Sequence, residues 1–305
     1  MKYIHPRRFL RSVIGVIYNW FWYYCVPDKW EIIHAFKNSL GCRPNLNQPK
    51  SFNEKIQWLK LHDRKPMYTS LIDKFQAKQI VANIIGEEHI IPTLLGPFYD
   101  VNEVPWDNLP NKCVIKCNHD AASVIFCQNR KDLNVKNAKT KLSACLNRNY
   151  YHYVGKQWGY KDINPCIFVE QLMKNGDKAV LEDYKFMMFN GKCRCIFTCS
   201  DRYSKEGMKV DFYSPEWQLL PFTRSYPNTS VPLSPPKQLS KMLEIAEKLA
   251  AYVNNPFVRV DLYEINAMVY FSELTFYPGG GLEAFQPIEW DYILGSWIDL
   301  TKGVV

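Results

Sequence analysis

Two runs of alternating apolar residues in the C-terminal part constrain the fold of this chain most. They cover residues 257–263 and 268–276, and a short polar break around Asn266 separates them. Because side chains in a β-strand alternate between two faces, each run predicts a strand with one buried face. The short break between the runs predicts that the two strands form an antiparallel hairpin.

The register of this hairpin decides which charged side chains meet. Arg259 and Asp261 share one face of the first strand, and Glu273 and Thr275 share one face of the second. A three-residue loop over 266–268 places Asp261 opposite Glu273, whereas a two-residue loop turns the two pairs to opposite faces. In the first register, two carboxylates converge on a hard cation such as Mg²⁺, with an arginine beside it for phosphoryl oxygens. The spacing alone equally allows an exposed sheet face with cross-strand ion pairs.

The rest of the chain alternates helical and strand-like segments, without a repeat or a clear linker. The spacing of apolar residues predicts helices over 54–62, 69–85, 134–150 and 237–252. Ser51 and Glu54 form the capping-box signature that starts the first of them. Strand-like runs cover 90–95, 113–117, 123–127, 166–171, 184–189 and 193–199, and Asn190-Gly191 between the last two is a strong hairpin signal. These segments predict an α+β protein with mostly antiparallel strands.

Lys116 interrupts an apolar strand and precedes the small polar loop 118–123. Such a loop offers backbone N–H groups to a phosphate, and a nearby lysine neutralises the phosphate charge, although the chain has no Walker A sequence. The same lysine also fits an edge position from which its ammonium extends into water. Glu170 ends another apolar strand, and Lys185 lies inside a third. These residues alone leave nucleotide binding open.

The positive charge is concentrated at the N-terminal end. The 305 residues carry a formal charge of +8, and residues 1–27 contain four basic residues and no acidic one: Lys2, Arg7, Arg8 and Arg11. A nucleic-acid-binding domain usually has a denser basic stripe, so we expect no nucleic-acid partner. The apolar run over 13–26 is shorter than the roughly 20 residues that span a bilayer. Residues 1–27 therefore predict either peripheral association with an anionic membrane surface or a helix docked on protein.

The ten cysteines predict free structural thiols rather than a disulfide framework. Six of them lie in apolar, strand-like runs, where a thiol behaves as a small hydrophobic group. No C-x-x-C pair occurs, and no histidine stands at zinc-ligand spacing from Cys193, Cys195 or Cys199. Reduced thiols are typical of the cytosol, so we expect a cytoplasmic protein, at the inner face of the membrane if residues 1–27 bind it.

A series of short motifs runs from about residue 51 to residue 295: SFNEKIQWL at 51–59, DK at 73–74, VIKCNH at 114–119, VE at 169–170, DYKF at 183–186, VRVDLY at 258–263 and ELTF at 273–276. In this order and spacing they resemble the TupA-like branch of the ATP-grasp superfamily, which is linked to the synthesis of teichuronopeptide and surface polysaccharide. The resemblance implies an ATP-grasp fold, in which two α+β subdomains clamp ATP between antiparallel sheets. Residues 51–305 would form this domain, with a mobile lid at about 112–168, after a basic and aromatic helical extension over 1–50.

The resemblance also implies roles for individual residues. The expected ATP contacts are Lys74, Lys116, Ser123, Glu170 and Lys185. Arg259 and Lys116 are the expected catalytic residues at the transferred phosphoryl group. Two Mg²⁺ ions are expected at Asp261, Glu273 and Thr275, where Thr275 replaces the Asn of many relatives. We expect substrate contacts at Arg202, at Arg224 and in the turn 279–281.

The activity that the resemblance implies is ATP-dependent carboxylate–amine ligation. Phosphorylation of a carboxylate gives an acyl phosphate, and attack by an amine gives an amide with release of phosphate. The expected substrates are a small amine or amino acid and a uronic acid of a bacterial capsular or other surface polysaccharide. Two alternatives stay open. One is a glycosyltransferase, which the absence of any D-x-D sequence disfavours, and the other is a non-catalytic nucleotide-binding protein at the membrane surface.

Overall fold

The computed structural model describes residues 24–120, 123–153, 155–174, 181–200 and 207–303. Most of the basic segment 1–27 lies outside these ranges, and Arg202 does too. Within the described ranges, every helix is too short or too polar to cross a bilayer. Membrane association of residues 1–27 therefore stays a prediction.

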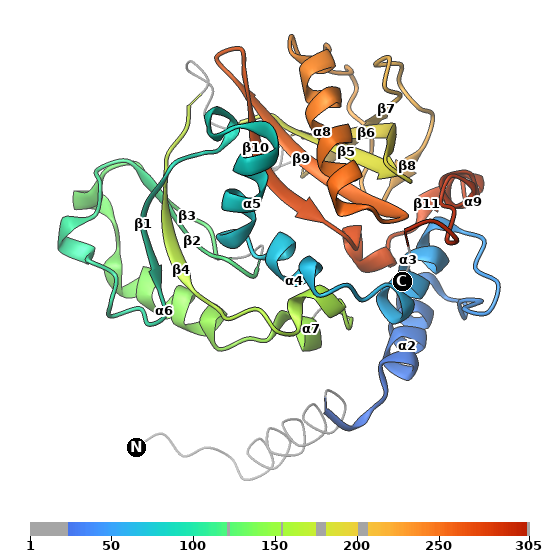
Figure 1. Ribbon diagram of the computed structural model, residues 1–305, viewed down its shortest axis with the longest axis horizontal. Coiled ribbons are helices and arrows are strands. Elements are labelled where there is room, and N and C mark those ends of the chain that lie inside the picture. Colours follow the sequence, from blue (N-terminus) through green and yellow to red (C-terminus); the bar gives the residue numbers. More distant parts are fainter. Residues whose placement is uncertain (1–23, 121–122, 154, 175–180, 201–206, 304–305) are drawn as a thin grey trace.

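The larger sheet has five antiparallel strands in the order β10-β9-β5-β6-β7 (Figure 1). Its strands are β5 (Asp183–Phe189), β6 (Lys192–Ser200), β7 (Lys209–Tyr213), β9 (Phe257–Ile265) and β10 (Met268–Thr275). Helix α8 (Leu239–Val253) lies against β5, β6 and β9, and its buried side chains include Met242 and Leu249. The β5–β6 turn is Asn190-Gly191, and both residues have positive φ, which confirms the expected hairpin.

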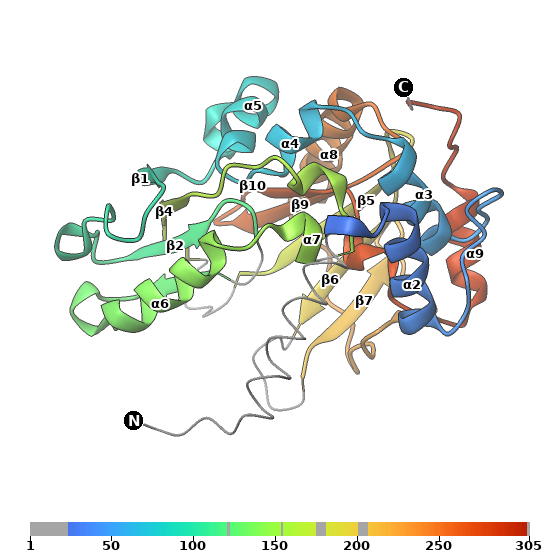
Figure 2. The same cartoon turned by 90° about the horizontal axis from the view of Figure 1, so that it is seen from below.

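The smaller sheet has four antiparallel strands in the order β1-β4-β2-β3 (Figure 2). They are β1 (Thr93–Phe98), β2 (Cys113–Cys117), β3 (Ile125–Cys127) and β4 (Ile167–Gln171). Helix α6 (Val135–Leu146) packs against this sheet and forms with it a second hydrophobic core. The sheet draws on residues 93–171, and a moving lid at about 112–168 stays a prediction.

The remaining elements connect and cover the two sheets. The helices are α2 (Asp28–Leu40), α3 (Phe52–His62), α4 (Met67–Ile72), α5 (Gln76–Ile85), α7 (Tyr150–Tyr153) and α9 (Glu289–Ser296). A two-stranded sheet joins β8 (Thr223–Arg224) to β11 (Phe285–Gln286). All ten cysteines are free thiols and seven of them are buried, as expected for structural thiols, whereas Cys199 is half-buried. The described fold is the expected α+β class with antiparallel sheets.

The β9–β10 hairpin reaches the expected pairing by an unexpected route. Its loop has two residues, Asn266 and Ala267, rather than the three that the pairing seemed to need. A β-bulge at Ser272 adds one residue to β10, and beyond it Asp261 lies opposite Glu273. Because one extra residue reverses the face on which later side chains lie, the bulge restores the register that a two-residue loop would lose.

One face of α3 holds the turn that follows β10. Ser51 caps the helix and shares a complete capping box with Glu54, as the sequence predicted. Gln57 Nε2 donates hydrogen bonds to the carbonyl oxygens of Gly280 and Gly281 at 2.9 and 2.7 Å. Lys60 Nζ donates to Gly280 O at 2.7 Å from a fully buried position. The motif at 51–59 therefore begins a helix whose buried polar face fixes the turn beside β10.

We expect Ala267→Gly to stabilise the fold. Ala267 has φ near +62°, a conformation that costs an alanine about 1–2 kcal/mol and a glycine little. Part of this gain is offset by the greater entropy of glycine in the unfolded chain, so we expect a net increase of about 0.5 kcal/mol in the free energy of unfolding, measured with urea. The matched control is Ala251→Gly on the exposed side of α8, which should lower stability. Equal effects of the two substitutions would contradict this account of the turn.

We expect Lys60→Met to remove a pH dependence of stability. Burial lowers the pKa of Lys60 from 10.5 to about 7. Between these values the unfolded chain binds the proton and the folded protein does not, so the contribution of Lys60 to stability rises with pH. The slope is up to about 1.4 kcal/mol per pH unit. Urea unfolding of both proteins from pH 7 to pH 10 should show this rise in wild type relative to the variant, and parallel curves would exclude it.

Candidate active site

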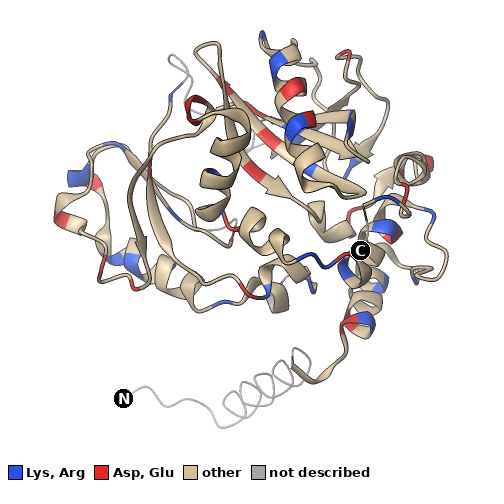
Figure 3. Ribbon diagram, in the orientation of Figure 1, with Lys and Arg blue, Asp and Glu red and all other residues tan. Residues whose placement is uncertain are grey.

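Five residues on one face of the larger sheet form a row across its strands. The register pairs Glu273 with Asp261, and Asp261 with Lys185. The row continues from Lys185 to Phe197 and from Phe197 to Phe212. Directly opposite residues of antiparallel strands project to the same face. The row therefore runs from two carboxylates through one ammonium group to two aromatic rings, and Figure 3 shows acidic segments on the β9–β10 hairpin near the centre of the molecule.

Arg259 binds both carboxylates. Its Nε and Nη2 donate to Asp261 Oδ1 and Oδ2, each at 2.6 Å, and Nη2 also donates to Glu273 Oε1 at 3.2 Å. Since one nitrogen contacts both carboxylates, Asp261 and Glu273 converge on one point, which is one of the two registers left open by the sequence and the one that the family resemblance implies. Asp261 is completely buried, so its charge depends on these partners.

Two lysines complete the balance of charge. Lys185 Nζ lies 2.7 Å from Asp261 Oδ2 and also contacts Asp183, while Lys74 Nζ lies 3.2 Å from Glu273 Oε2. Burial disfavours the ionised form of Glu273, but Lys74, Arg259 and Lys185 outweigh this effect and hold its pKa well below the usual range. The Glu273 carboxylate is therefore ionised at neutral pH.

A break between two helices places Lys74 in this cluster. The continuous helix expected over 69–85 is wrong, because α4 ends at Ile72 and α5 starts at Gln76. Asp73 Oδ1 accepts hydrogen bonds from the first N–H groups of α5, and Asp73 Oδ2 accepts one from Asn118 Nδ2 at 2.8 Å. The Lys74 N–H donates to Asn118 O at 2.9 Å. The break thus ties Lys74 to the end of β2 while its side chain reaches β10.

A second charged cluster lies on the smaller sheet. Lys116 on β2 and Glu170 on β4 form an ion pair, with Nζ 2.6 Å from Oε2. Lys78 on α5 contacts the other oxygen of the same carboxylate, and both ammonium groups lie over the Phe168 ring. Burial alone would raise the pKa of Glu170, but Lys116 and Lys78 lower it below the usual range. The structure thus brings together Lys116 and Glu170, as the family motifs imply, and their contacts with ATP stay predictions.

Two residues near these clusters escaped the sequence reasoning. Lys78 lies on a helix, where a lysine most often faces solvent, and nothing in the local sequence marks its contact with Glu170. Tyr160 follows α6 and α7 and belongs to none of the motifs. Burial raises the pKa of Tyr160 to about 12, with Lys74 lowering it and Glu273 raising it, so its hydroxyl lies within electrostatic range of both.

The loop after β2 is anchored at both ends. Ser123 Oγ accepts a hydrogen bond from the Cys117 N–H at 2.8 Å and donates one to Asp120. His119 Nε2 contacts the carbonyl oxygens of Cys145 and Arg148 at 3.1 and 3.2 Å, which joins the loop to the end of α6. Residues 121–122 lie outside the described ranges. An ATP contact by Ser123 therefore stays a prediction.

Among the described residues, those that we expected to contact the substrate do not belong to either charged cluster. Arg224, on β8, is buried and its Nε lies 3.0 Å from Glu283 Oε2. Arg202 falls outside the described residues, so its role stays a prediction. The turn 279–281 lies directly after β10, where α3 holds it. Glu283 follows the turn 279–281 and also contacts Arg224, so these two expected substrate contacts have a common neighbour.

The oxygen atoms of Asp261, Glu273 and Thr275 fit Mg²⁺. Thr275 Oγ1 donates to Glu273 Oε1 at 3.5 Å, so all three side chains share one region of the sheet face. The described residues contain no group of three or more His, Cys, Asp or Glu side chains suited to a metal. Mg²⁺ usually takes one or two carboxylates together with substrate phosphates and water rather than a cage made of protein alone. The donor set therefore suits Mg²⁺ that binds together with a triphosphate.

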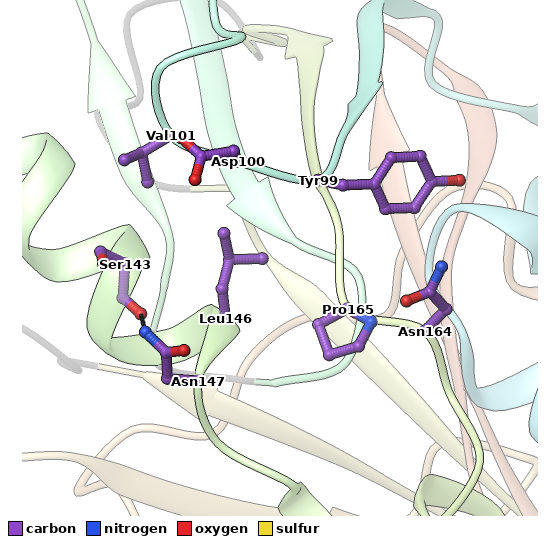
Figure 4. A pocket seen from close by; sticks show the side chains of 8 residues that line it. All are labelled: Tyr99, Asp100, Val101, Ser143, Leu146, Asn147, Asn164 and Pro165. Atoms are coloured by element: carbon purple, nitrogen blue, oxygen red, sulfur yellow. Dashed lines mark hydrogen bonds between the residues drawn. The ribbon is translucent and has the colours of Figure 1, made fainter.

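Neither Asp261 nor Glu273 lines either of two hollows on the protein surface. One of about 260 Å³ is lined by the segment after β1, the end of α6 and the segment before β4, with Asp100, Leu146 and Asn164 among the lining residues (Figure 4). None of the expected site residues lines it. Another of about 220 Å³ shares Leu146 with it and reaches Tyr160. The charged clusters on the two sheets, rather than these hollows, form the candidate active site.

Solved structures with low similarity to this chain are ATP-grasp ligases and related enzymes. D-alanine–D-alanine ligase from Helicobacter pylori is 14% identical, with a TM-score of 0.39, over 76% of this chain and 64% of that one. A biotin carboxylase domain from Hydrogenobacter thermophilus is 12% identical, with a TM-score of 0.43, over 74% and 46%. L-amino acid ligase from Bacillus licheniformis is 12% identical, with a TM-score of 0.40, over 70% and 42%. This chain thus spans between 42% and 64% of their lengths.

The comparison with curated proteins gives no match. The comparison with protein families gives one described as TupA-like ATPgrasp, which matches residues 54–299. This range includes both sheets, both charged clusters and the turn after β10. Because the match covers most of the chain, the protein belongs to the TupA-like ATP-grasp family.

Proposed function

We propose that this protein is an ATP-dependent, ADP-forming carboxylate–amine ligase. The family consists of ATP-grasp proteins, and the proposal adds the reaction and its substrates. The acid is a uronic acid of a bacterial surface polysaccharide such as a capsule, and the amine is an amino acid or another small amine. The reaction takes place on the cytoplasmic side of the membrane, where residues 1–27 hold the enzyme at the surface.

The observation that carries the proposal is the mutual neutralisation of charges on the sheet face. Asp261 and Glu273 are held by Arg259, Lys185 and Lys74, all within 3.2 Å. A triphosphate needs the cations, and Mg²⁺ needs the carboxylates. When both bind, the cations pair with the triphosphate and the carboxylates pair with Mg²⁺, so that no buried charge is left unpaired. The triphosphate alone would leave the carboxylates without partners, and Mg²⁺ alone would leave the cations without partners. A buried cluster of this composition therefore suits Mg²⁺ with ATP.

The chemistry uses these groups for position and charge. A carboxylate oxygen of the acid attacks the γ-phosphorus of ATP and the bond to ADP breaks. The neutral amine nitrogen then attacks the acyl carbon, the bond to phosphate breaks, and the nitrogen gives up one proton, which leaves with the phosphate, to form the amide. Arg259 and Lys116 neutralise the phosphoryl oxygens during transfer, and Lys74 and Lys185 hold the phosphate chain. The bound metal supplies charge neutralisation at Asp261 and Glu273.

The second cluster suits the nucleoside end of ATP. Glu170 lies near the end of β4, where Lys78 binds one oxygen of its carboxylate. Lys116 binds the other oxygen in this structure and would turn to the phosphate chain when ATP binds. A fixed, ionised carboxylate accepts hydrogen bonds from the two hydroxyl groups of a ribose. The family assignment does not support the alternative function of a glycosyltransferase. The test below distinguishes a ligase from a non-catalytic nucleotide-binding protein.

We expect Glu273→Gln to lower ADP formation at least about 100-fold, because it removes one metal-binding charge at the phosphoryl group. ADP release is measured with ATP and Mg²⁺ in a screen that pairs uronic acids with amines. The matched control is Glu247→Gln, which removes an exposed carboxylate paired with Lys192 and should leave the rate unchanged. Circular dichroism checks that both variants fold.

Three results would count against the proposal. Equal ADP release by wild type and Glu273→Gln would show that the expected metal site takes no part in the reaction. ATP binding without ADP release under any pair of substrates would favour a non-catalytic protein. Turnover of a sugar nucleotide without ATP would favour a glycosyltransferase.

A further inference from the structure

Arg224 is a buried cation with few partners. Its side chain is 7% exposed, and its guanidinium carries five N–H donors. Among the described residues, its charged contact is Glu283 Oε2, 3.0 Å from Nε, and Nη1 is buried without any hydrogen-bond partner. A buried donor without an acceptor has lost its hydrogen bonds to water without gaining one from the protein. A loss of this kind calls for an explanation beyond folding.

The Arg224 guanidinium lies above the row of site residues. It is 4.9 Å from the centre of the Phe197 ring and 5.5 Å from that of Phe212. The guanidinium of Arg259 lies 5.6 Å from the same Phe197 ring. Phe197 is directly opposite Lys185, which binds Asp261. Arg224 therefore lies on the same face of the sheet as the charged cluster, about one strand away from Lys185. It is a neighbour of Arg259, the arginine expected at the phosphoryl group.

Glu283 places a carboxylate between Arg224 and the turn after β10. Its side chain is 26% exposed, so the ion pair is open to solvent on the Glu283 side. The carboxylate lies so close to Gly279 that a side chain at that position would collide with it. Asn53 Nδ2 holds the Glu283 carbonyl oxygen at 2.9 Å. The first family motif thus fixes the backbone of Glu283 as well as the turn.

We propose that Arg224 and Glu283 bind the two charges of an α-amino acid, the amine substrate of the proposed ligase. This inference rests on the proposed function and names the class of one substrate. The carboxylate of the amino acid replaces Glu283 on Arg224, and its ammonium group binds Glu283. The ion pair seen here is then the empty form of the site, in which the two residues neutralise each other.

The charge balance of this site selects a zwitterion. A simple amine would bind Glu283 and leave Arg224 buried without a carboxylate, and a simple acid would leave Glu283 unpaired. A molecule with both charges satisfies both residues at once. Truncating one charge of such a ligand costs about 1.5–3 kcal/mol per lost ionic hydrogen bond, which corresponds to a roughly 10- to 100-fold loss of affinity.

The test compares each common L-amino acid with its α-amide, which keeps the ammonium group and lacks the carboxylate. Binding is measured by calorimetry on the full chain, with Mg²⁺ and a non-hydrolysable ATP analogue present. We expect wild type to bind at least one amino acid about tenfold or more tightly than its amide. Arg224→Gln should lose this preference, Arg224→Lys should keep part of it, and Glu283→Gln should weaken both ligands.

The controls separate binding from folding. Lys192→Gln and Glu247→Gln break a comparable ion pair on the surface and should leave the preference unchanged. Melting curves check the fold, and Glu283→Gln serves as the milder variant because its side chain is partly exposed. An unchanged preference in Arg224→Gln, or no amino-acid binding by wild type, would overturn the inference.

ADP release in the same samples separates this inference from the proposed function. Amino-acid binding that depends on Arg224, without ADP release, would support the subsite and count against the ligase reaction. ADP release with an unchanged KM for the amino acid in Arg224→Gln would support the ligase and overturn the subsite.

Discussion

The bidentate contact of Arg259 with Asp261 is the interaction on which the rest of the site depends. Asp261 is completely buried on β9, between β10 and β5, where a lone carboxylate would be costly. Arg259 supplies two hydrogen bonds of 2.6 Å, and the same guanidinium reaches Glu273. Lys185 and Lys74 complete the neutralisation from a neighbouring strand and from the break between α4 and α5. A buried ion cluster of this kind contributes little net stability, so its presence is better explained by the ligands it awaits.

The two charged clusters lie on different sheets, and Lys74 links them. Its backbone N–H is bonded to Asn118 at the end of β2, and its side chain is bonded to Glu273 on β10. The Lys116–Glu170 pair lies on the same small sheet as Asn118. A molecule that binds both clusters therefore spans the space between the sheets. Any movement of one sheet relative to the other would change the distance between the two clusters.

The sequence predicted most elements of this fold, because their signals are local. The capping box at Ser51, the Asn190-Gly191 turn and the amphipathic helix α8 all appear where the pattern placed them. The sequence left the pairing of Asp261 with Glu273 open between two loop lengths, and the structure combines the two-residue loop with a bulge that pairs these residues. A bulge at Ser272 has no sequence signal of its own, since it exists only in the pairing of β10 with β9. The sequence also did not predict the role of Lys78 or the helix break before α5. Tertiary contacts determine both: Lys78 contacts Glu170 on β4, and the break is bonded to Asn118 after β2.

The central claim is that the cations and carboxylates of this cluster exchange partners when Mg²⁺ and a triphosphate bind. A structure with Mg²⁺ and a non-hydrolysable ATP analogue tests it most directly. The account predicts oxygens of Asp261 and Glu273 at about 2.0–2.1 Å from Mg²⁺, with Arg259, Lys185 and Lys74 turned to phosphate oxygens. A nucleotide bound elsewhere, with the Arg259–Asp261 and Lys74–Glu273 pairs still in place, would contradict it.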